Sequence, residues 1–312
     1  MTTLLVASTG GHLTQLFNLV NRIQGLDEDR LWVSFDCEQT RTLLRGEETR
    51  FVPYIAERSV SGVICAAGHA RKIMGRKGEV TAVVSTGSAI ALSFLPYAIS
   101  RGIEAHYIES AARVDQPSIT GRLLSLVPGV RLYRQYPHVA DRDWKFGGSV
   151  FDGFAGACGG GREVRRVVVT VGTDKGFRRM IAAAAAILPK DIDVLWQTGH
   201  TPVDDLGIKA RPFVPAAELE QAMREADVVL AHAGCGSALS ALAAGKYPVL
   251  LPRDPQHGEV IDRHQIEIAR WLGERGLAFA STPESLTFGD LQAAAARIVA
   301  QRAAPPFELA RS

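Results

Sequence analysis

Short apolar runs alternate with amphipathic stretches along most of this chain. Residues 4–7 form a continuous apolar run, and the apolar residues at positions 13, 16, 17, 20 and 23 then recur at helical spacing. The first pattern is typical of a buried strand and the second of one face of a helix. A strand followed by a helix is therefore predicted at the start of the chain.

The same alternation continues through both halves of the chain. Further strands are predicted over 31–35, 80–85, 105–108, 130–133, 167–171, 194–197, 227–231 and 247–251. Further helices are predicted over 88–100, 119–127, 177–188, 216–225, 237–244 and 263–272. This order implies βαβ units and parallel sheets that helices cover on both faces. The predicted class is α/β.

A glycine-rich stretch divides the pattern into two parts. Residues 152–162 hold five glycines in eleven positions, a composition that favours a flexible connection. We predict a Rossmann-like domain over 1–151, a linker over 152–163 and a second Rossmann-like domain over 164–312, whose last helix packs back on the first domain. Ligands of open parallel sheets bind at the carboxyl ends of the strands, so both sheets are expected to face an interdomain cleft.

Net charge, cysteine positions and the absence of long apolar stretches limit the partners, metal sites and locations that the sequence predicts. The net charge is only +2, which gives no argument for nucleic acid, although residues 1–150 carry 17 Lys and Arg against 14 Asp and Glu. The four cysteines are scattered without a C-x-x-C pair, so neither a zinc site nor a disulfide framework is expected. The chain has no signal-peptide pattern and no apolar stretch near the ~20 residues that span a bilayer. A cytoplasmic protein with at most peripheral membrane contact is expected.

Two loops at predicted strand ends have the composition of anion sites. Residues 232–237, HAGCGS, lie between a strand and a helix, and Gly172-Thr173 follow another strand. Glycines allow close approach of the backbone, and the N–H groups of a helix start favour a diphosphate. Ser237 suits the N-cap position. Such turns also occur without a ligand, so these loops alone leave both interpretations open.

Longer motifs carry a family resemblance. Residues 167–177, VVVTVGTDKGF, and 232–269 resemble the donor half of MurG-like glycosyltransferases of family 28. Residues 8–16, STGGHLTQL, 83–98, VVSTGSAIALSFLPYA, and 107–127, YIESAARVDQPSITGRLLSLV, are similar to the acceptor subunit of two-subunit transferases that extend lipid-diphosphate sugars. The chain resembles these two subunits fused, acceptor half first.

The resemblance implies a GT-B fold and an activity. It implies inverting, metal-independent transfer of a sugar from a UDP-sugar to a polyprenyl-diphosphate-linked saccharide, in exopolysaccharide or cell-surface glycan synthesis. It implies no cofactor, and a place on the inner face of the plasma membrane. Two alternatives remain: an enzyme like UDP-N-acetylglucosamine 2-epimerase, which also uses two Rossmann-like halves, and a non-catalytic nucleotide-sugar-binding module.

The resemblance also suggests the donor-binding residues. The glycine loops and Ser237 would hold the UDP leaving group, Arg253 would supply a fixed positive charge, and Glu259 and Gln265 would contact sugar or ribose hydroxyls. Alternatively, Glu259 and Asp262 only cap the following helix. The full set is Gly172, Thr173, His232, Gly234, Gly236, Ser237, Arg253, Gln256, Glu259 and Gln265.

One departure bears on the donor sugar. Ser240 stands where the relatives carry a glutamate associated with the ribose. This favours UDP-glucose, UDP-galactose or UDP-glucuronate, with UDP-N-acetylglucosamine still open.

On the acceptor side, the base is expected to be His12 or Glu109. Either side chain could accept the proton of the acceptor hydroxyl, or Glu109 could orient His12. Alternatively, His12 only bonds to the backbone and fixes the turn. The residues expected to line the acceptor are Gly10, Gly11, Thr86, Gly87 and Ser88.

Residues 63–78 have the composition of an interfacial helix. Apolar Val63, Ile64, Ile73 and Met74 are interspersed with basic residues, which favours contact with anionic headgroups, and 90–97 would add apolar area. The alternative is a core-facing helix with a solvated basic face. The expected membrane contacts are Arg71, Lys72, Arg76 and Lys77.

Overall fold

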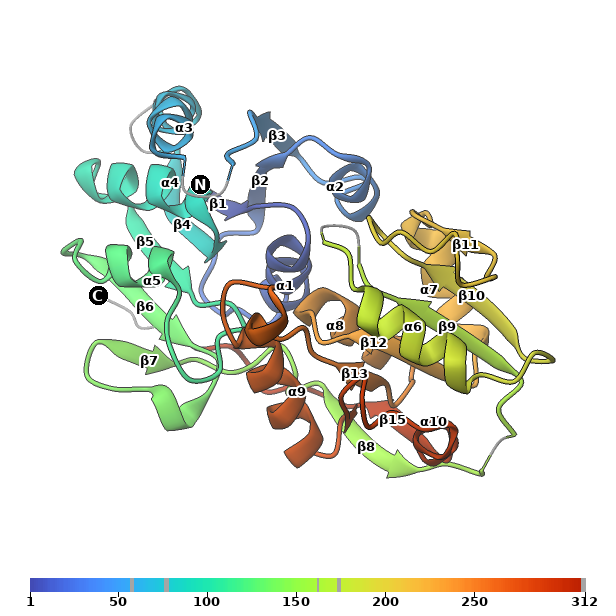
Figure 1. Cartoon of the computed structure of the whole chain (residues 1–312). Coiled ribbons are helices and arrows are strands. Elements are labelled where there is room, and N and C mark those ends of the chain that lie inside the picture. Colours follow the sequence, from blue (N-terminus) through green and yellow to red (C-terminus); the bar gives the residue numbers. More distant parts are fainter. Residues whose placement is uncertain (57–58, 76–78, 162, 173–174, 310–312) are drawn as a thin grey trace. The chain divides into compact units, whose positions relative to one another are not determined.

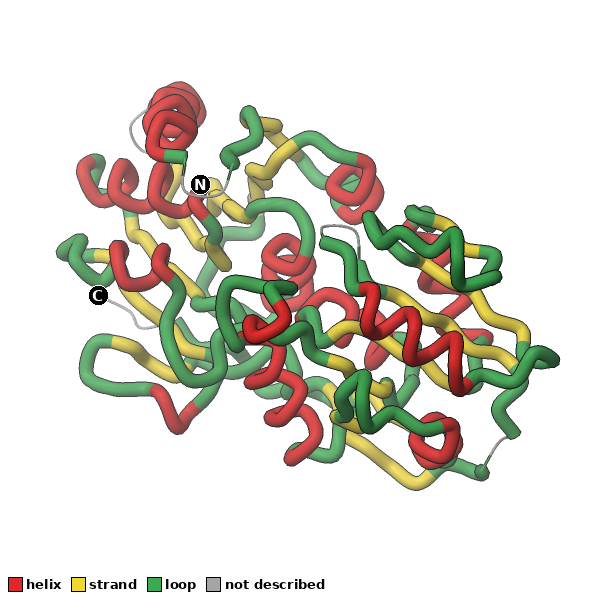
Figure 2. The backbone as a smooth tube through the Cα atoms, in the orientation of Figure 1, coloured by secondary structure: helices red, strands yellow, loops and turns green. Residues whose placement is uncertain are grey.

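A computed structural model describes residues 1–56, 59–75, 79–161, 163–172 and 175–309 of the chain. The chain divides into two compact units. Unit 1 comprises Met1–Val150 together with the segment from Pro305 onward, and unit 2 comprises Phe151–Ala304. Figure 1 labels the elements of each unit, and Figure 2 separates helices from strands.

Unit 1 is built on a seven-stranded sheet whose strands are all parallel. In sheet order these are β3 (Thr49–Val52), β2 (Asp29–Phe35), β1 (Thr2–Ala7), β4 (Val80–Gly87), β5 (Glu104–Ile108), β6 (Val130–Arg134) and β7 (Trp144–Phe146). The helices are α1 (Gly11–Val20), α2 (Glu38–Leu43), α3 (Val60–Ile73), α4 (Ala89–Ser100) and α5 (Ile119–Leu124), with a 3-10 turn at Pro137–Val139. The predicted α/β class is confirmed.

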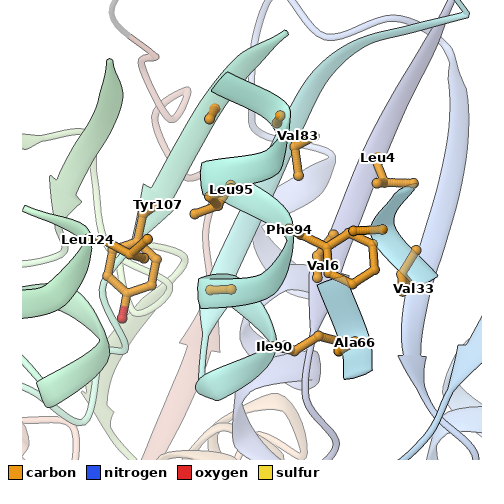
Figure 3. Close-up of a cluster of buried hydrophobic side chains, with 14 of the residues drawn as sticks. Leu4, Val6, Val33, Ala66, Val83, Ile90, Phe94, Leu95, Tyr107 and Leu124 are labelled. Carbon is orange, nitrogen blue, oxygen red and sulfur yellow. The ribbon is translucent and has the colours of Figure 1, made fainter. Parts of the chain in front are cut away.

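One face of this sheet is covered by α3, α4 and α5. Buried side chains of these helices share a single apolar cluster with the strands, and Figure 3 shows Phe94 of α4 beside Val6 of β1. Ala66 of α3 and Leu124 of α5 belong to the same cluster. These three helices therefore present their outer surfaces on the same side of unit 1.

Unit 2 repeats the plan with six parallel strands. In sheet order these are β11 (Ala210–Arg211), β10 (Asp193–Gln197), β9 (Arg166–Thr170), β12 (Val228–His232), β13 (Val249–Leu251) and β14 (Phe279–Ala280). The helices are α6 (Arg178–Ile187), α7 (Ala216–Glu225), α8 (Cys235–Ala243), α9 (His264–Glu274) and α10 (Phe288–Ala295), with a 3-10 turn at Pro255–His257.

Each sheet reverses its strand order at one position. In unit 1 the chain runs outward from β1 through β2 to β3 and then returns to place β4 on the other side of β1. In unit 2 the corresponding reversal lies between β9 and β12. Because loops on either side of a reversal diverge, the carboxyl ends of these two strand pairs are where open α/β sheets bind ligands.

The predicted flexible linker is wrong in part. Within 152–163, residues Phe154–Cys158 form strand β8, which pairs antiparallel with β15 (Arg297–Gln301). A Cβ at Gly156 would lie 2.0 Å from Gly276 O, so this glycine allows the strand to pass close to another backbone segment. The glycines in this stretch serve close packing as well as turns.

The end of the chain also differs from the prediction. The last helix of the described residues, α10, belongs to unit 2, and residues 305–309, which return to unit 1, form no helix. Phe307 is fully buried there, 5.9 Å from the Tyr133 ring centre, and its N–H donates to Arg22 O at 2.8 Å. Arg22 in turn donates to Pro305 O and Ser149 O. The chain therefore passes between the units twice.

Candidate functional site

The carboxyl edge of the unit 2 sheet is lined by three loops that contain glycine. These loops follow β9, β10 and β12. A Cβ at Gly172 would lie 2.8 Å from Cε1 of His232, and a Cβ at Gly234 would lie 2.2 Å from its Nε2. A Cβ at Gly199 would lie 2.8 Å from Gly172 O. The imidazole of His232 thus fits between two backbone segments that only glycine allows to come so close.

The N-terminus of α8 opens beside this imidazole. Gly234 is the N-cap, Cys235, Gly236 and Ser237 are the first three helical residues, and the first helical bond runs from Ala238 N to Gly234 O at 3.0 Å. The helix therefore begins earlier than predicted, and Ser237 is not the N-cap. Its Oγ lies 3.4 Å from His232 Nδ1. The N–H groups of residues 235–237 precede the first helical bond and are suited to an anion.

His232 is a neutral group in this setting. Burial, and then the charge of Arg253, lower the pKa of His232 to about 3, although the residue as a whole is partly exposed. An uncharged imidazole can hydrogen bond to Ser237 or to a ligand but adds no positive charge.

Arg253 lies at the same edge, but it faces backbone carbonyls. It is 4% exposed, and its guanidinium donates to Val171 O at 2.8 Å, to Gly176 O at 3.2 Å and to Lys175 O. Its backbone N–H donates to Oε1 of Gln265 at 3.0 Å. The Arg253 guanidinium thus bonds to carbonyl groups of the protein, whereas the sequence predicted that its charge would face the leaving group.

The remaining predicted donor residues are Glu259, Gln256, Gln265 and Thr173. Glu259 accepts both Nε and Nη2 of Arg179 at 2.9 and 2.8 Å, and it also accepts the N–H of Asp254 at 2.9 Å. Gln256 is exposed, and its N–H donates to the Asp254 side chain. Buried Gln265 supports Arg253, as described above. Thr173 lies outside the described residues.

Sequence reasoning missed two features of this edge. The loop after β10 contributes Gly199 and buried Thr198, and the QTGHT run carried no pattern that distinguished it from an ordinary turn. His264, the first residue of α9, hydrogen bonds through Nδ1 to Asp262 Oδ1. Asp262 also accepts the backbone N–H of His264 at 3.3 Å, although the N-cap of α9 is Arg263.

The carboxyl edge of the unit 1 sheet brings the predicted acceptor residues together. Gly10 is the N-cap of α1 with φ 78°, and Gly11 and His12 start the helix. His12 Nδ1 lies 2.8 Å from Thr86 O, and the Thr86 hydroxyl donates to His12 O at 2.8 Å. These contacts join the ends of β1 and β4 at the strand reversal.

The adjoining turn carries backbone strain. Ser88 has φ 63°, which makes it the one non-glycine residue with a positive φ in the described part of the chain. Gly87 lies against two side chains, since a Cβ there would be 3.1 Å from Tyr107 OH and 3.5 Å from His12 Cε1. Strain of this kind persists where the surrounding structure fixes the turn, and it is common at functional sites.

The Glu109 carboxylate is hydrogen bonded to groups of the surrounding segment, residues 107–118. The carboxylate is 1% exposed and accepts Tyr107 OH, Ser110 N, Ser118 N and Ser118 Oγ at 2.8–3.1 Å. Four donors occupy the acceptor positions of one carboxylate. A Cβ at Gly121 would lie 2.4 Å from Oε2, so α5 also packs closely on it. The geometry favours a positioning role over that of the base.

The predicted interfacial segment is more buried than expected. Met74 is 1% exposed and Val63 and Ile73 pack against the core, so only Ile64 of the four predicted apolar residues is exposed. Within 90–97, Ile90, Phe94 and Leu95 are fully buried and add no apolar surface. Arg71 and Lys72 are exposed, whereas Arg76 and Lys77 lie outside the described residues.

Two general findings complete the description of the sites. In the described residues, no helix has the length and apolar character needed to cross a membrane. The same part of the chain shows no group of three or more His, Cys, Asp and Glu side chains placed to hold a metal ion.

The two units together define the GT-B fold. The chain is similar over 94% of its length to a crystal structure of Acinetobacter baumannii MurG, with a TM-score of 0.57, 18% identity and 89% of that chain covered. It is similarly close to a structure of S. aureus MnaA with UDP, with a TM-score of 0.57, 10% identity, and coverage of 93% of this chain and 94% of that one. At these identities the likeness shows the fold alone.

The sequence comparisons relate unit 2 to one family of glycosyltransferases. Residues 166–305 match the glycosyltransferase family 28 C-terminal domain. A Neisseria gonorrhoeae UDP-N-acetylglucosamine–N-acetylmuramyl-(pentapeptide) pyrophosphoryl-undecaprenol N-acetylglucosamine transferase is 29% identical over 136 residues, 39% of this chain and 37% of that protein. The Yarrowia lipolytica UDP-N-acetylglucosamine transferase subunit ALG13 is 39% identical over 72 residues, 23% of this chain and 35% of that subunit. The chain thus spans just over a third of each of these relatives.

Proposed function

We propose that this chain is an inverting, metal-independent glycosyltransferase that moves a sugar from a UDP-sugar to a polyprenyl-diphosphate-linked saccharide. The observation that carries the proposal is the α8 N-terminus at the β9–β12 reversal, because it lies inside the residues that match family 28. The names of the two relatives both include UDP-N-acetylglucosamine as the donor, and the name of the Neisseria enzyme also includes a pyrophosphoryl-undecaprenol acceptor.

Unit 2 binds the donor in this proposal. When the sugar C1–O bond breaks, its electron pair stays with UDP, and negative charge grows on the diphosphate. The N–H groups of residues 235–237 and the positive end of the α8 dipole stabilise that charge. Because the residues that pack on His232 at positions 172 and 234 are glycines, no side chain there separates the backbone from the ligand.

Unit 1 activates the acceptor. A carbonyl oxygen can only accept a hydrogen bond, so the contact with Thr86 O makes Nδ1 of His12 the donor and leaves the lone pair on Nε2. Nε2 takes the proton of the acceptor hydroxyl while its oxygen bonds to C1 of the sugar on the face opposite UDP. Glu109 keeps the neighbouring loop in place.

A donor panel tests this function. We expect UDP to be released from one of UDP-glucose, UDP-galactose, UDP-glucuronate or UDP-N-acetylglucosamine, and only when a polyprenyl-diphosphate monosaccharide is present. Release of UDP and mass analysis of the lipid product provide the measurement. A changed sugar with intact UDP would instead indicate epimerisation, and binding without turnover would indicate a nucleotide-sugar-binding module.

The proposed setting is the synthesis of exopolysaccharide or another cell-surface glycan at the inner face of the plasma membrane. The outer surfaces of α3 and α5 support membrane contact. Val60 and Ile64 near the start of α3 are 72% and 68% exposed, and the exposed cations Arg71 and Lys72 lie near the end of the same helix. In and just after α5, the exposed apolar residues are Ile119, Leu123 and Leu126. Exposed apolar side chains beside cations are typical of interfacial helices.

Reversal of the α3 charges is expected to weaken membrane binding. Each cation near an anionic surface contributes about 1 kcal/mol, so R71E/K72E should lower the partition coefficient at least about 30-fold. Flotation with vesicles that contain phosphatidylglycerol measures this. The matched control is K190E/K209E, which makes the same charge change at exposed lysines of unit 2. Equal flotation of both variants would exclude α3 from the membrane contact.

A further inference from the structure

Arg253 bridges the two ends of the loop between β9 and α6. Val171 O lies at the start of that loop, and Lys175 O and Gly176 O lie near its end. A planar guanidinium presents five N–H donors in fixed directions, whereas the three donors of an ammonium rotate at the end of a flexible stem. Arg253 therefore closes this loop at its base.

The surroundings of Arg253 keep the guanidinium in place. Its Cζ lies 5.3 Å from the centre of the Phe177 ring, and Phe177 is 1% exposed. The backbone N–H of Arg253 donates to Gln265 at the start of α9, and Phe177 N donates to Thr201 Oγ1 at 2.9 Å. The loops after β9, β10 and β13 are thus tied to one another around this side chain.

We propose that Arg253 is a positioning residue of the donor site and not a ligand of the UDP phosphates: it fixes the loop between β9 and α6 through three carbonyls. The identity of the donor rests on the function proposed above, whereas the placement of Arg253 does not. Gly172, whose backbone faces His232, lies in the loop that Arg253 closes. Arg253 therefore acts on the diphosphate through the placement of Gly172 beside His232.

The charge of Arg253 has a second effect, on His232. Burial contributes most to the low pKa of His232, and the positive charge of Arg253 and then the neighbouring His264 act in the same direction. The Thr170 backbone and the Ser237 hydroxyl are the polar groups that bond to the ring. Loss of the Arg253 charge should therefore raise the pKa of His232, whereas its replacement by another cation should not.

Two variants separate the two effects. R253K keeps the charge but cannot bridge the carbonyls, and R253Q loses both. We expect KM for the UDP-sugar to rise at least tenfold in both variants, with KM for the acceptor within about threefold of wild type. In R253Q alone, NMR titration should show the His232 pKa shifted upward. R275Q, which removes an exposed arginine stacked on Trp271, is the control and should change neither.

The outcomes distinguish this proposal from its alternatives. An R253K variant with wild-type KM for the UDP-sugar would overturn it, because charge alone would then suffice, as for a phosphate ligand. Hydrogen exchange of ligand-free protein gives a readout that needs no turnover. The amides of Gly172 and Phe177, which donate to Thr170 Oγ1 and Thr201 Oγ1, should exchange at least tenfold faster in R253K and R253Q, and unchanged rates would overturn the proposal. If no donor is consumed while exchange rises as expected, only the proposed function fails.

Discussion

The His12→Asn variant is expected to lose about 100- to 10,000-fold in kcat, the usual contribution of a positioned general base. The asparagine amide N–H can replace Nδ1–H as the donor to Thr86 O, so the turn at the end of β1 is retained. The variant lacks any equivalent of Nε2, which is the atom proposed to take the proton. Steady-state turnover, with UDP affinity measured by calorimetry, provides the check, and affinity should stay within about threefold.

Glu109→Gln is the matched comparison for His12→Asn. An amide replaces one carboxylate oxygen with a donor, which would face the donors that now surround Glu109. The expected result is a lower melting temperature with kcat reduced less than tenfold. Retention of more than a tenth of wild-type kcat by His12→Asn, together with a larger loss in Glu109→Gln, would transfer the role of base to the carboxylate.

Gly234→Ala should produce the second-largest effect, a 10- to 100-fold loss in kcat/KM for the UDP-sugar. The new methyl would lie 2.2 Å from Nε2 of His232, and the movement of the imidazole is limited because Gly172 also packs against the ring, at Cε1. Overpacking of this kind costs about 1–3 kcal/mol. The displaced groups are the imidazole and the start of α8, so donor affinity should be affected most.

Two further variants test whether the clash with His232 causes the loss expected for Gly234→Ala. At Gly160 an added methyl meets nothing within 4 Å, so Gly160→Ala controls for the substitution itself. The double variant His232→Ala/Gly234→Ala removes the imidazole that clashes, and it should recover donor affinity relative to Gly234→Ala. If the double variant binds UDP no better, the contact between Gly234 and His232 is not what limits the site.

The alternation of strands and helices could be predicted from the sequence because each buried parallel strand is itself an apolar run. The loops that end at His12 and at Ser237 were also identifiable, since glycine next to a strand end leaves a local signature. Pairing of β8 with β15 joins residues far apart in the chain, and FAGACGGG by itself has the composition of a linker. No local pattern encodes that partner.

The hydrogen-bond partners of charged side chains also could not be predicted from the sequence. Arg253 was identified at the right edge of the sheet, but a sequence does not state which of its donors are already used by carbonyls. Glu259 was similarly placed near the donor loops, and its pairing with Arg179 depends on α6 lying next to it in space. In both cases the residue type was informative and its partners were set by tertiary packing.

The return of the chain to unit 1 has a consequence for any version of this protein made as two polypeptides. A chain divided at residue 150 would leave the first piece without Phe307, whose ring packs against Tyr133, and the second piece would carry that ring near its free end. The pieces would still recognise each other, because the backbone bonds of Phe307 to Arg22 and of Glu308 to Gly147 would form between chains. We therefore expect the two pieces of a chain divided in this way to reassemble without a covalent link.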